Sequence, residues 1–212
     1  MATSSPETID VSFLPGWTVA EQSAAGVVLS HALRIGPRCD DVVVVIIDGP
    51  AGSGKTVLAG QLRRVARASG VSCTVVQMDD LYEGWAGMRA GGEAATDLLR
   101  ALAQGDPASY RRYNWVSEQY TERVPVPPVS LLVIEGVGSA RLEHLDLASA
   151  LVWVEEPDPQ ERLRRGLARD GAEIEAHWRR WMVEEAELFA EVGTCHRADI
   201  RLDGWGRITA GP

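Results

Sequence analysis

Hydrophobic positions along the chain form five short runs that alternate with stretches of mixed polarity. The runs are rich in β-branched residues and end in polar turns, and they cover residues 42–48, 72–78, 130–135, 150–155 and 199–203. Continuous apolar runs of this length are typical of strands buried on both faces, and strands that alternate with helices favour a parallel sheet. The pattern predicts an α/β fold in three layers, with a five-stranded parallel sheet and helices on both of its faces.

The stretches between the runs predict helices, two of them with clear signals. One begins at Asp158, an N-cap residue followed by Pro159, and stops at Gly171. The other, over residues 173–192, places large apolar side chains on one face: Ile174, Trp178, Trp181, Leu188 and Phe189. Further helices are expected earlier in the chain, over residues 19–33, 55–68 and 93–103.

The composition fits a single globular domain over residues 1–212. The chain has 212 residues, of which 45% are hydrophobic and 24% charged, so it can bury a substantial core. We expect residues 1–40 to form an N-terminal helical extension. Residues 83–128 are the least regular segment and form an insertion at one edge of the sheet, where long insertions are usually functional or mobile.

The charge and the cysteines bear on partners and location. A formal net charge of −9 argues against binding to nucleic acid or to an anionic membrane. The three cysteines are far apart and form no Cys-x-x-Cys pair, which suits a reducing compartment. The longest apolar run is too short to span a bilayer, and the N-terminus does not resemble a signal peptide. We therefore expect a cytoplasmic protein without nucleic acid or membrane as a partner, and a homo-oligomer remains open.

The strongest motif is a complete match to GxxxxGK[ST]. It consists of Gly49, Pro50, Ala51, Gly52, Ser53, Gly54, Lys55 and Thr56. The glycines let the backbone wrap closely around an anion, and the helix that follows adds the positive end of its dipole. A glycine-rich turn without a ligand is the alternative, but strand, motif and helix occur here together. The motif predicts an ATP phosphate site, with Lys55 at the β- and γ-phosphates and the Thr56 hydroxyl at Mg²⁺.

Lys55 is also the only lysine in the chain, which has 21 lysine and arginine residues in all. A lysine ammonium is narrower than the planar fork of an arginine. The single lysine therefore indicates a position at which nothing wider fits.

Acidic residues follow two further predicted strands. Asp79 and Asp80 come after the second strand, and Glu135 ends the third. An aspartate at this edge can act as a general base for a substrate hydroxyl or hold Mg²⁺ through water, although aspartates also cap turns. Glu135 has the position of a carboxylate that organises Mg²⁺. Since the carboxyl ends of parallel strands meet at one edge of a sheet, we expect all three beside the phosphate loop.

The helix after Asp158 carries a cluster of arginines. Arg162, Arg165 and Arg169 are spaced so that they share one helix face. Arginines placed over a transferring phosphoryl group stabilise its negative charge, whereas most helical charge clusters are simply solvated.

These motifs together resemble the uridine kinase and phosphoribulokinase group of P-loop kinases, over most of residues 42–203. The similar segments are IDGPAGSGKT at the phosphate loop, QMDDLY after the second strand, YNWVS in the insertion, VIEGV at the third strand and RLRRGLARD in the lid. The resemblance implies a P-loop NTPase fold, with residues 158–171 as a lid and residues 83–128 on the substrate side. It assigns the catalytic base to Asp79, a substrate contact to Tyr82, the strand-end acid to Glu135, and lid contacts to Arg165 and Arg169.

One residue departs from the pattern of the group. The group has an aspartate that accepts hydrogen bonds from ribose hydroxyls, and this chain has Asn114 in its place. The adjacent Arg111 and Arg112 are candidates for an anionic substrate, and Tyr113 can stack against a base or sugar. A hydrophobic anchor for the insertion is an equally good interpretation of this patch.

The sequence thus predicts an enzyme that transfers the γ-phosphoryl group of ATP to a hydroxyl of a small molecule, in the first instance a nucleoside, with Mg²⁺ as cofactor. Lys55, Asp79, Arg165 and Arg169 are its candidate catalytic residues. One alternative is a nucleoside monophosphate kinase, and another is a P-loop ATPase or nucleotide switch that acts through a protein partner. The acceptor, the choice of ATP over GTP, and the choice of Asp79 over Asp80 as base remain open.

Overall fold

The computed structural model describes residues 23–211, and its centre is a twisted six-stranded sheet. The strand order is β2-β5-β1-β6-β7-β8. The strands are β1 (Val43–Asp48), β2 (Cys73–Gln77), β5 (Leu131–Glu135), β6 (Ala150–Glu155), β7 (Ile200–Asp203) and β8 (Ile208–Ala210). The first five of these confirm the five predicted apolar runs, and they pair in parallel.

The sixth strand corrects the prediction of a five-stranded, all-parallel sheet. β8 has three residues and runs antiparallel to β7 after a tight turn. Its sequence, ITA, is too short to register as an apolar run of its own. It covers the edge of β7, which would otherwise expose unpaired backbone groups.

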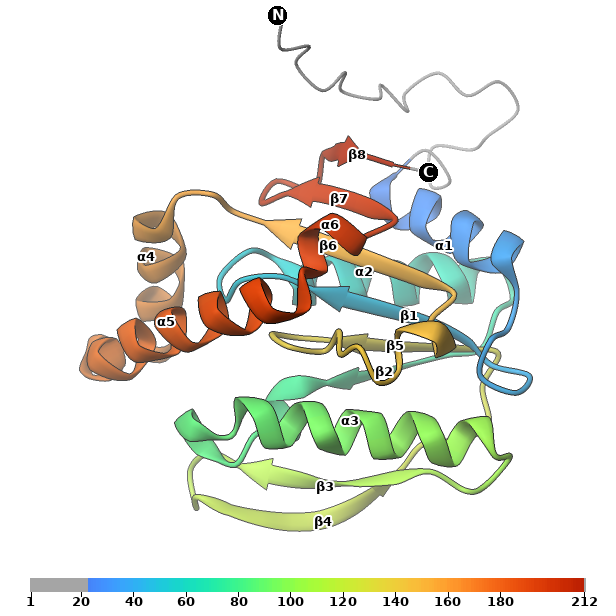
Figure 1. Ribbon diagram of the computed structural model, residues 1–212, viewed down its shortest axis with the longest axis horizontal. Coiled ribbons are helices and arrows are strands. Elements are labelled where there is room, and N and C mark those ends of the chain that lie inside the picture. Colours follow the sequence, from blue (N-terminus) through green and yellow to red (C-terminus); the bar gives the residue numbers. More distant parts are fainter. Residues whose placement is uncertain (1–22, 212) are drawn as a thin grey trace, which may run out of the picture.

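Helices lie on both faces of the sheet, as Figure 1 shows. They are α1 (Ala24–Ile35), α2 (Lys55–Ala68), α3 (Met88–Ala103), α4 (Pro159–Asp170), α5 (Glu175–Val192) and α6 (Thr194–Arg197). The alternation of side chains along β1 divides the core. Val44 and Ile46 belong to the cluster that α3 and α5 cover, whereas Val45 and Ile47 belong to the cluster that α1 and α2 cover. This confirms the three-layer α/β architecture.

Helix ends follow the predicted signals in α4 but not in α3. The Asp158 side chain accepts a hydrogen bond from the backbone N–H of Gln160, Pro159 opens α4, and the helix ends at Gly171. Helix α3 begins at Met88, five residues before the predicted start at 93. The prediction missed its first turns because they contain Gly91 and Gly92, and glycine is a poor helix former. A Cβ on Gly91 would lie 2.6 Å from the Tyr82 ring, so close packing requires glycine there.

The N-terminal helix also differs from its predicted range. α1 begins at Ala24, with the Ser23 side chain accepting a hydrogen bond from the backbone N–H of Gly26. The predicted start at residue 19, and residues 1–22 of the predicted extension, lie outside the described residues.

The aromatic and basic patch of the insertion forms a separate two-stranded hairpin. It consists of β3 (Ser109–Asn114) and β4 (Gln119–Pro125), and it lies along α3 (Figure 1). The Asn114 side-chain oxygen accepts hydrogen bonds from the backbone N–H groups of Val116 and Ser117, at 2.9 and 3.0 Å, and so stabilises the turn. Across residues 23–211, no helix is both long and apolar enough to cross a membrane.

Candidate functional site

The predicted functional residues of the strand ends meet at the carboxyl edge of the sheet. β1 is the strand between β5 and β6, and the loop that follows it joins β1 to α2. Asp79 follows β2 in a short 3₁₀ helix, η2 (Met78–Asp80), and Glu135 ends β5. Ligands of open parallel sheets bind at this edge.

The loop at residues 49–56 has the tight backbone that its glycines predict. Gly49 and Gly52 have positive φ values of 140° and 79°. A Cβ on Gly49 would lie 2.1 Å from the Val154 carbonyl oxygen, and one on Gly52 would lie 2.8 Å from that of Arg162. Both positions therefore require glycine for conformation and for space. Gly54 then opens α2, whose first N–H groups and positive dipole end point into the loop.

Lys55 lies at the centre of this loop. Its ammonium group donates hydrogen bonds to the carbonyl oxygens of Gly49 at 2.7 Å and Pro50 at 2.8 Å. The side chain is 7% exposed, and burial lowers its pKa while the nearby carboxylates, Glu135 first among them, raise it. A buried ammonium that hydrogen-bonds only to carbonyl groups is a strong anchor for an anion in this loop.

Thr56 and Glu135 form the donor set expected of a magnesium site. The Thr56 hydroxyl donates to Glu135 Oε1 at 3.0 Å, and the Gln77 side chain donates to the same oxygen at 3.3 Å. Burial raises the pKa of Glu135 and nearby Lys55 lowers it. Mg²⁺ prefers oxygen ligands and usually takes only one or two from the protein, the others coming from phosphates and water. The residues present therefore fit Mg²⁺, although the described part of the chain contains no cluster of three or more metal-binding side chains.

The adjacent aspartates have different surroundings. Asp80 Oδ2 accepts hydrogen bonds from the Tyr110 hydroxyl at 3.2 Å and from Arg112 Nε at 3.3 Å. The Asp79 carboxylate has no hydrogen-bond or ion-pair partner among residues 23–211. Desolvation raises the pKa of Asp79, and the nearby charges of Arg169 and Lys55 lower it. Asp80 thus secures the hairpin, whereas Asp79 is free to contact a ligand.

The three arginines of α4 have separate partners. Arg165 Nη1 donates to the Gly52 carbonyl at 3.3 Å, and its other nitrogens pair with Glu156 and Glu161. Arg169 pairs with the adjacent Asp170 at 2.6 Å and lies close enough to Asp79 to affect its pKa. Arg162 pairs with Glu185 of α5 and, like Arg165, donates to a carbonyl of the loop, that of Ala51 at 3.4 Å.

The predicted substrate contacts lie in several environments. Tyr82 is buried, and its hydroxyl donates to the Val137 carbonyl at 2.6 Å. Asn114 ends β3 and its side chain caps the hairpin turn, and Arg112 pairs with Asp80 and Glu122. Arg111 lies on the hairpin with its guanidinium 4.9 Å from the centre of the Tyr120 ring.

Aromatic side chains gather beside Asp79. Tyr113 contacts the edge of Trp115 at 5.6 Å between ring centres, and Trp115 contacts Trp85 in the same way at 5.4 Å. The Trp115 indole donates to the Asp79 carbonyl at 2.9 Å, and Trp85 stacks on His177 of α5. The hairpin, the segment after β2 and α5 therefore meet beside the backbone of Asp79.

Three carboxylates of the site were missed by sequence reasoning. Asp48 is fully buried and accepts hydrogen bonds from the backbone N–H groups of Gly49, Gly138 and Ala140, and burial raises its pKa to about 6. Glu156 holds Arg165, and Glu185 holds Arg162 and the loop. Two of them could have been found in the sequence as acidic residues at positions expected to be buried. Asp48 ends an apolar run, and Glu185 falls on the apolar face of α5 with Trp178, Trp181 and Leu188.

Comparison with known proteins places this architecture among P-loop kinases. No protein-family model matches the sequence, and no curated protein is similar enough to match it. Among solved structures, a possible uridine kinase from Bacillus stearothermophilus is 25% identical with a TM-score of 0.57, over 76% of this chain and 89% of that one.

Two further structures share the fold at lower identity. A protein assigned as a fructose transport system kinase of Silicibacter sp. TM1040 is 19% identical with a TM-score of 0.61, over 80% of this chain and 95% of that one. D-glycerate 3-kinase from Cryptococcus neoformans is 16% identical with a TM-score of 0.55, over 91% of this chain and 98% of that one. The protein thus has the fold of the uridine kinase and phosphoribulokinase group of P-loop kinases, as its motifs indicated.

Proposed function

We propose that the protein is a Mg²⁺-dependent kinase that transfers the γ-phosphoryl group of ATP to a hydroxyl of a small molecule. The observation that carries this proposal is the Asp79 carboxylate, which has no partner in the described part of the chain and lies at the same sheet edge as the Lys55 phosphate loop. A phosphate loop alone binds a nucleotide, whereas a free carboxylate beside it can also activate an acceptor. The kinases of the same fold support this assignment.

In the proposed reaction the acceptor hydroxyl lies between Asp79 and the γ-phosphate. Asp79 takes the proton of the hydroxyl as the oxygen attacks phosphorus, and ADP leaves with the electron pair of the broken P–O bond. Lys55 and the lid arginines Arg165 and Arg169 stabilise the negative charge that spreads over the transferring group. Closure of α4 over the loop would exclude water, which would otherwise compete as the acceptor.

Thr56 and Glu135 would hold Mg²⁺ in this scheme. The bound ion would neutralise charge on the β- and γ-phosphate oxygens. The hydrogen bond between the two side chains already places a hydroxyl and a carboxylate oxygen 3.0 Å apart, as such a shared site needs.

We propose a nucleoside as the first class of acceptor. The aromatic residues Trp115 and Trp85, which Tyr113 supports from the hairpin, offer flat surfaces to a base or a sugar face beside Asp79. Because the Asn114 oxygen is engaged in the hairpin turn, the ribose would need other hydrogen-bond partners than in the uridine kinases. The names of two structures with the same fold, a fructose transport system kinase and a D-glycerate 3-kinase, make fructose and glycerate the next acceptors to test.

The test is release of ADP in a coupled assay with Mg²⁺-ATP and a panel of acceptors. Nucleosides, nucleoside monophosphates, fructose and glycerate are each added separately, with the Asp79→Asn variant as the control. Stimulation by one class, lost in the variant, identifies a kinase and its acceptor. Stimulation only by monophosphates would establish the monophosphate kinase instead. ATP turnover that no acceptor stimulates would overturn the proposal in favour of an ATPase or switch.

A further inference from the structure

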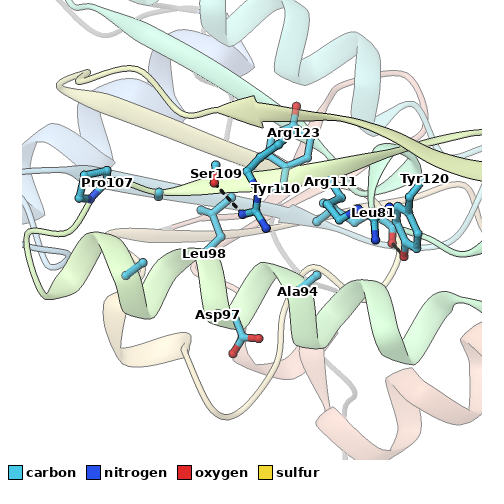
Figure 2. Close-up of a pocket in the computed structure, with 12 residues that line it drawn as sticks. Leu81, Ala94, Asp97, Leu98, Pro107, Ser109, Tyr110, Arg111, Tyr120 and Arg123 are labelled. Carbon is cyan, nitrogen blue, oxygen red and sulfur yellow. Dashed lines mark hydrogen bonds between the residues drawn. The ribbon is translucent and has the colours of Figure 1, made fainter.

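A hollow lies between α3 and the β3–β4 hairpin, and no residue of the phosphate loop lines it. Its volume is ≈ 460 Å³, within the range of small-molecule sites. Figure 2 shows Ala94 and Leu98 of α3 on one side, and Arg111, Arg123 and Tyr120 of the hairpin on the other. The hollow therefore combines an apolar wall on the helix with a basic wall on the hairpin.

The basic wall contains two arginines that directly face each other across the hairpin. Arg111 and Arg123 are partners in the antiparallel register of β3 and β4. Side chains at opposite positions lie on the same face of the two strands, and like charges placed there are destabilising. The chain keeps this unfavourable pair in a protein whose net charge is −9.

Neither arginine is neutralised by the described residues. Arg123 Nη1 donates to the Ser109 hydroxyl at 2.9 Å, and Arg111 lies over the Tyr120 ring, but neither forms an ion pair within residues 23–211. Asp97, the acidic residue of the hollow, is strongly exposed and lies 3.9 Å from Arg100 of its own helix. By contrast Arg112, next in sequence, pairs with both Asp80 and Glu122.

We propose that this hollow binds a small organic anion, with a phosphate or carboxylate group on Arg111 and Arg123 and a compact apolar group against Ala94, Leu98 and Leu81. Guanidinium groups form paired hydrogen bonds with both kinds of anion, and an anion between them removes their mutual repulsion. The apolar residues of the hollow favour an organic anion over a fully hydrated inorganic one.

The hollow adjoins the candidate active site through two hydrogen bonds. The Tyr120 hydroxyl donates to the Leu81 carbonyl at 3.1 Å, and the Tyr110 hydroxyl donates to Asp80 at 3.2 Å. Leu81, Tyr110 and Tyr120 all line the hollow. A bound anion would therefore contact the segment that carries Asp79, but the binding proposal does not depend on phosphoryl transfer.

Calorimetry with phenyl phosphate tests the proposal. The titration uses the full chain with Lys55→Ala, which weakens the phosphate loop as a competing anion site. Benzoate, inorganic phosphate and phenol are the comparison ligands. Arg111→Gln and Arg123→Gln are each added to this background, and Arg100→Gln serves as the control because Arg100 is on α3 but does not line the hollow.

We expect phenyl phosphate or benzoate to bind in the Lys55→Ala background, and each hairpin substitution to weaken binding by about tenfold or more. Arg100→Gln should leave the affinity unchanged. Absence of binding, or equal affinity in the hairpin variants, would overturn the site. If inorganic phosphate binds as tightly as phenyl phosphate, or if phenol binds as tightly as either, the ligand of the hollow is not an organic anion and the proposal is wrong. Thermal unfolding of each variant confirms that a lost affinity does not reflect a lost fold.

Discussion

Glu185 accepts a hydrogen bond of 2.8 Å at its Oε2 atom from the backbone N–H of Ala51, in the middle of the phosphate loop. Its other oxygen pairs with Arg162 of α4, and Arg162 also reaches the Ala51 carbonyl at 3.4 Å. One carboxylate on α5, only 1% exposed, thereby links the loop to the helix that carries the lid arginines. The position of the loop is thus set in part by a helix far away in the sequence.

Removal of this carboxylate should destabilise the protein. Glu185→Ala would leave the Arg162 guanidinium buried without its partner, and we expect a loss of about 3 kcal/mol or more in the free energy of unfolding. Glu185→Gln keeps an oxygen acceptor and should cost less. Urea unfolding measures both, with Glu187→Ala, an exposed residue on the same helix, as the control. A loss no larger than that of the control would mean that the pair does not stabilise the fold.

Lys55→Ala should weaken the binding of a non-hydrolysable ATP analogue by about tenfold or more, because the loop loses its charged hydrogen-bond donor. Titration calorimetry in the presence of Mg²⁺ provides the affinity. Arg67→Ala, an exposed substitution near the end of α2, controls for the loss of one positive charge. Equal affinities in Lys55→Ala and the unmodified protein would place the nucleotide elsewhere.

Substitutions of the two aspartates after β2 should have different effects, one on catalysis and the other on stability. Asp79→Asn should lower kcat by about 10²- to 10⁴-fold with little change in nucleotide affinity, since it removes only the proposed base. Asp80→Asn breaks the pairing with Arg112 and should mainly lower stability, by about 1–2 kcal/mol. Steady-state kinetics and urea unfolding of both variants check this division. The assignment fails if Asp80→Asn, and not Asp79→Asn, abolishes turnover.

Asp48 should make stability depend on pH in an unusual direction. Burial raises its pKa from 3.8 to about 6, so the folded state binds its proton more tightly than the unfolded state. The contribution of Asp48 to the free energy of unfolding is therefore fully present below about pH 4. It falls by about 3 kcal/mol in total as the pH rises to about 6.

The measurement is urea unfolding of the unmodified protein and Asp48→Asn at pH 4 and pH 6.5. On acidification from pH 6.5 to pH 4, the unfolding free energy of the unmodified protein should rise relative to that of Asp48→Asn, because the amide does not titrate. A pH-independent difference would show that the buried carboxyl has an ordinary pKa in the folded state. Other titrating groups affect both proteins alike and cancel in this difference.

The sequence by itself determined the parts of this protein that depend on local patterns. The five apolar runs predicted the parallel strands, and Asp158, Pro159 and Gly171 predicted both ends of α4. The motif at residues 49–56 predicted a tight loop between a strand and a helix, because its glycines, helix start and strand are contiguous in the chain.

Only the tertiary structure decided which polar groups meet. Glu185 reaches Ala51 across 134 positions of sequence, and Asp80 holds Tyr110 and Arg112 while Asp79 stays free, although the two aspartates look alike in the sequence. Arg111 and Arg123 likewise lie opposite each other only because of the register of the hairpin strands. Apolar periodicity records which faces are buried, whereas a hydrogen bond depends on the relative position of two side chains that folding alone brings together.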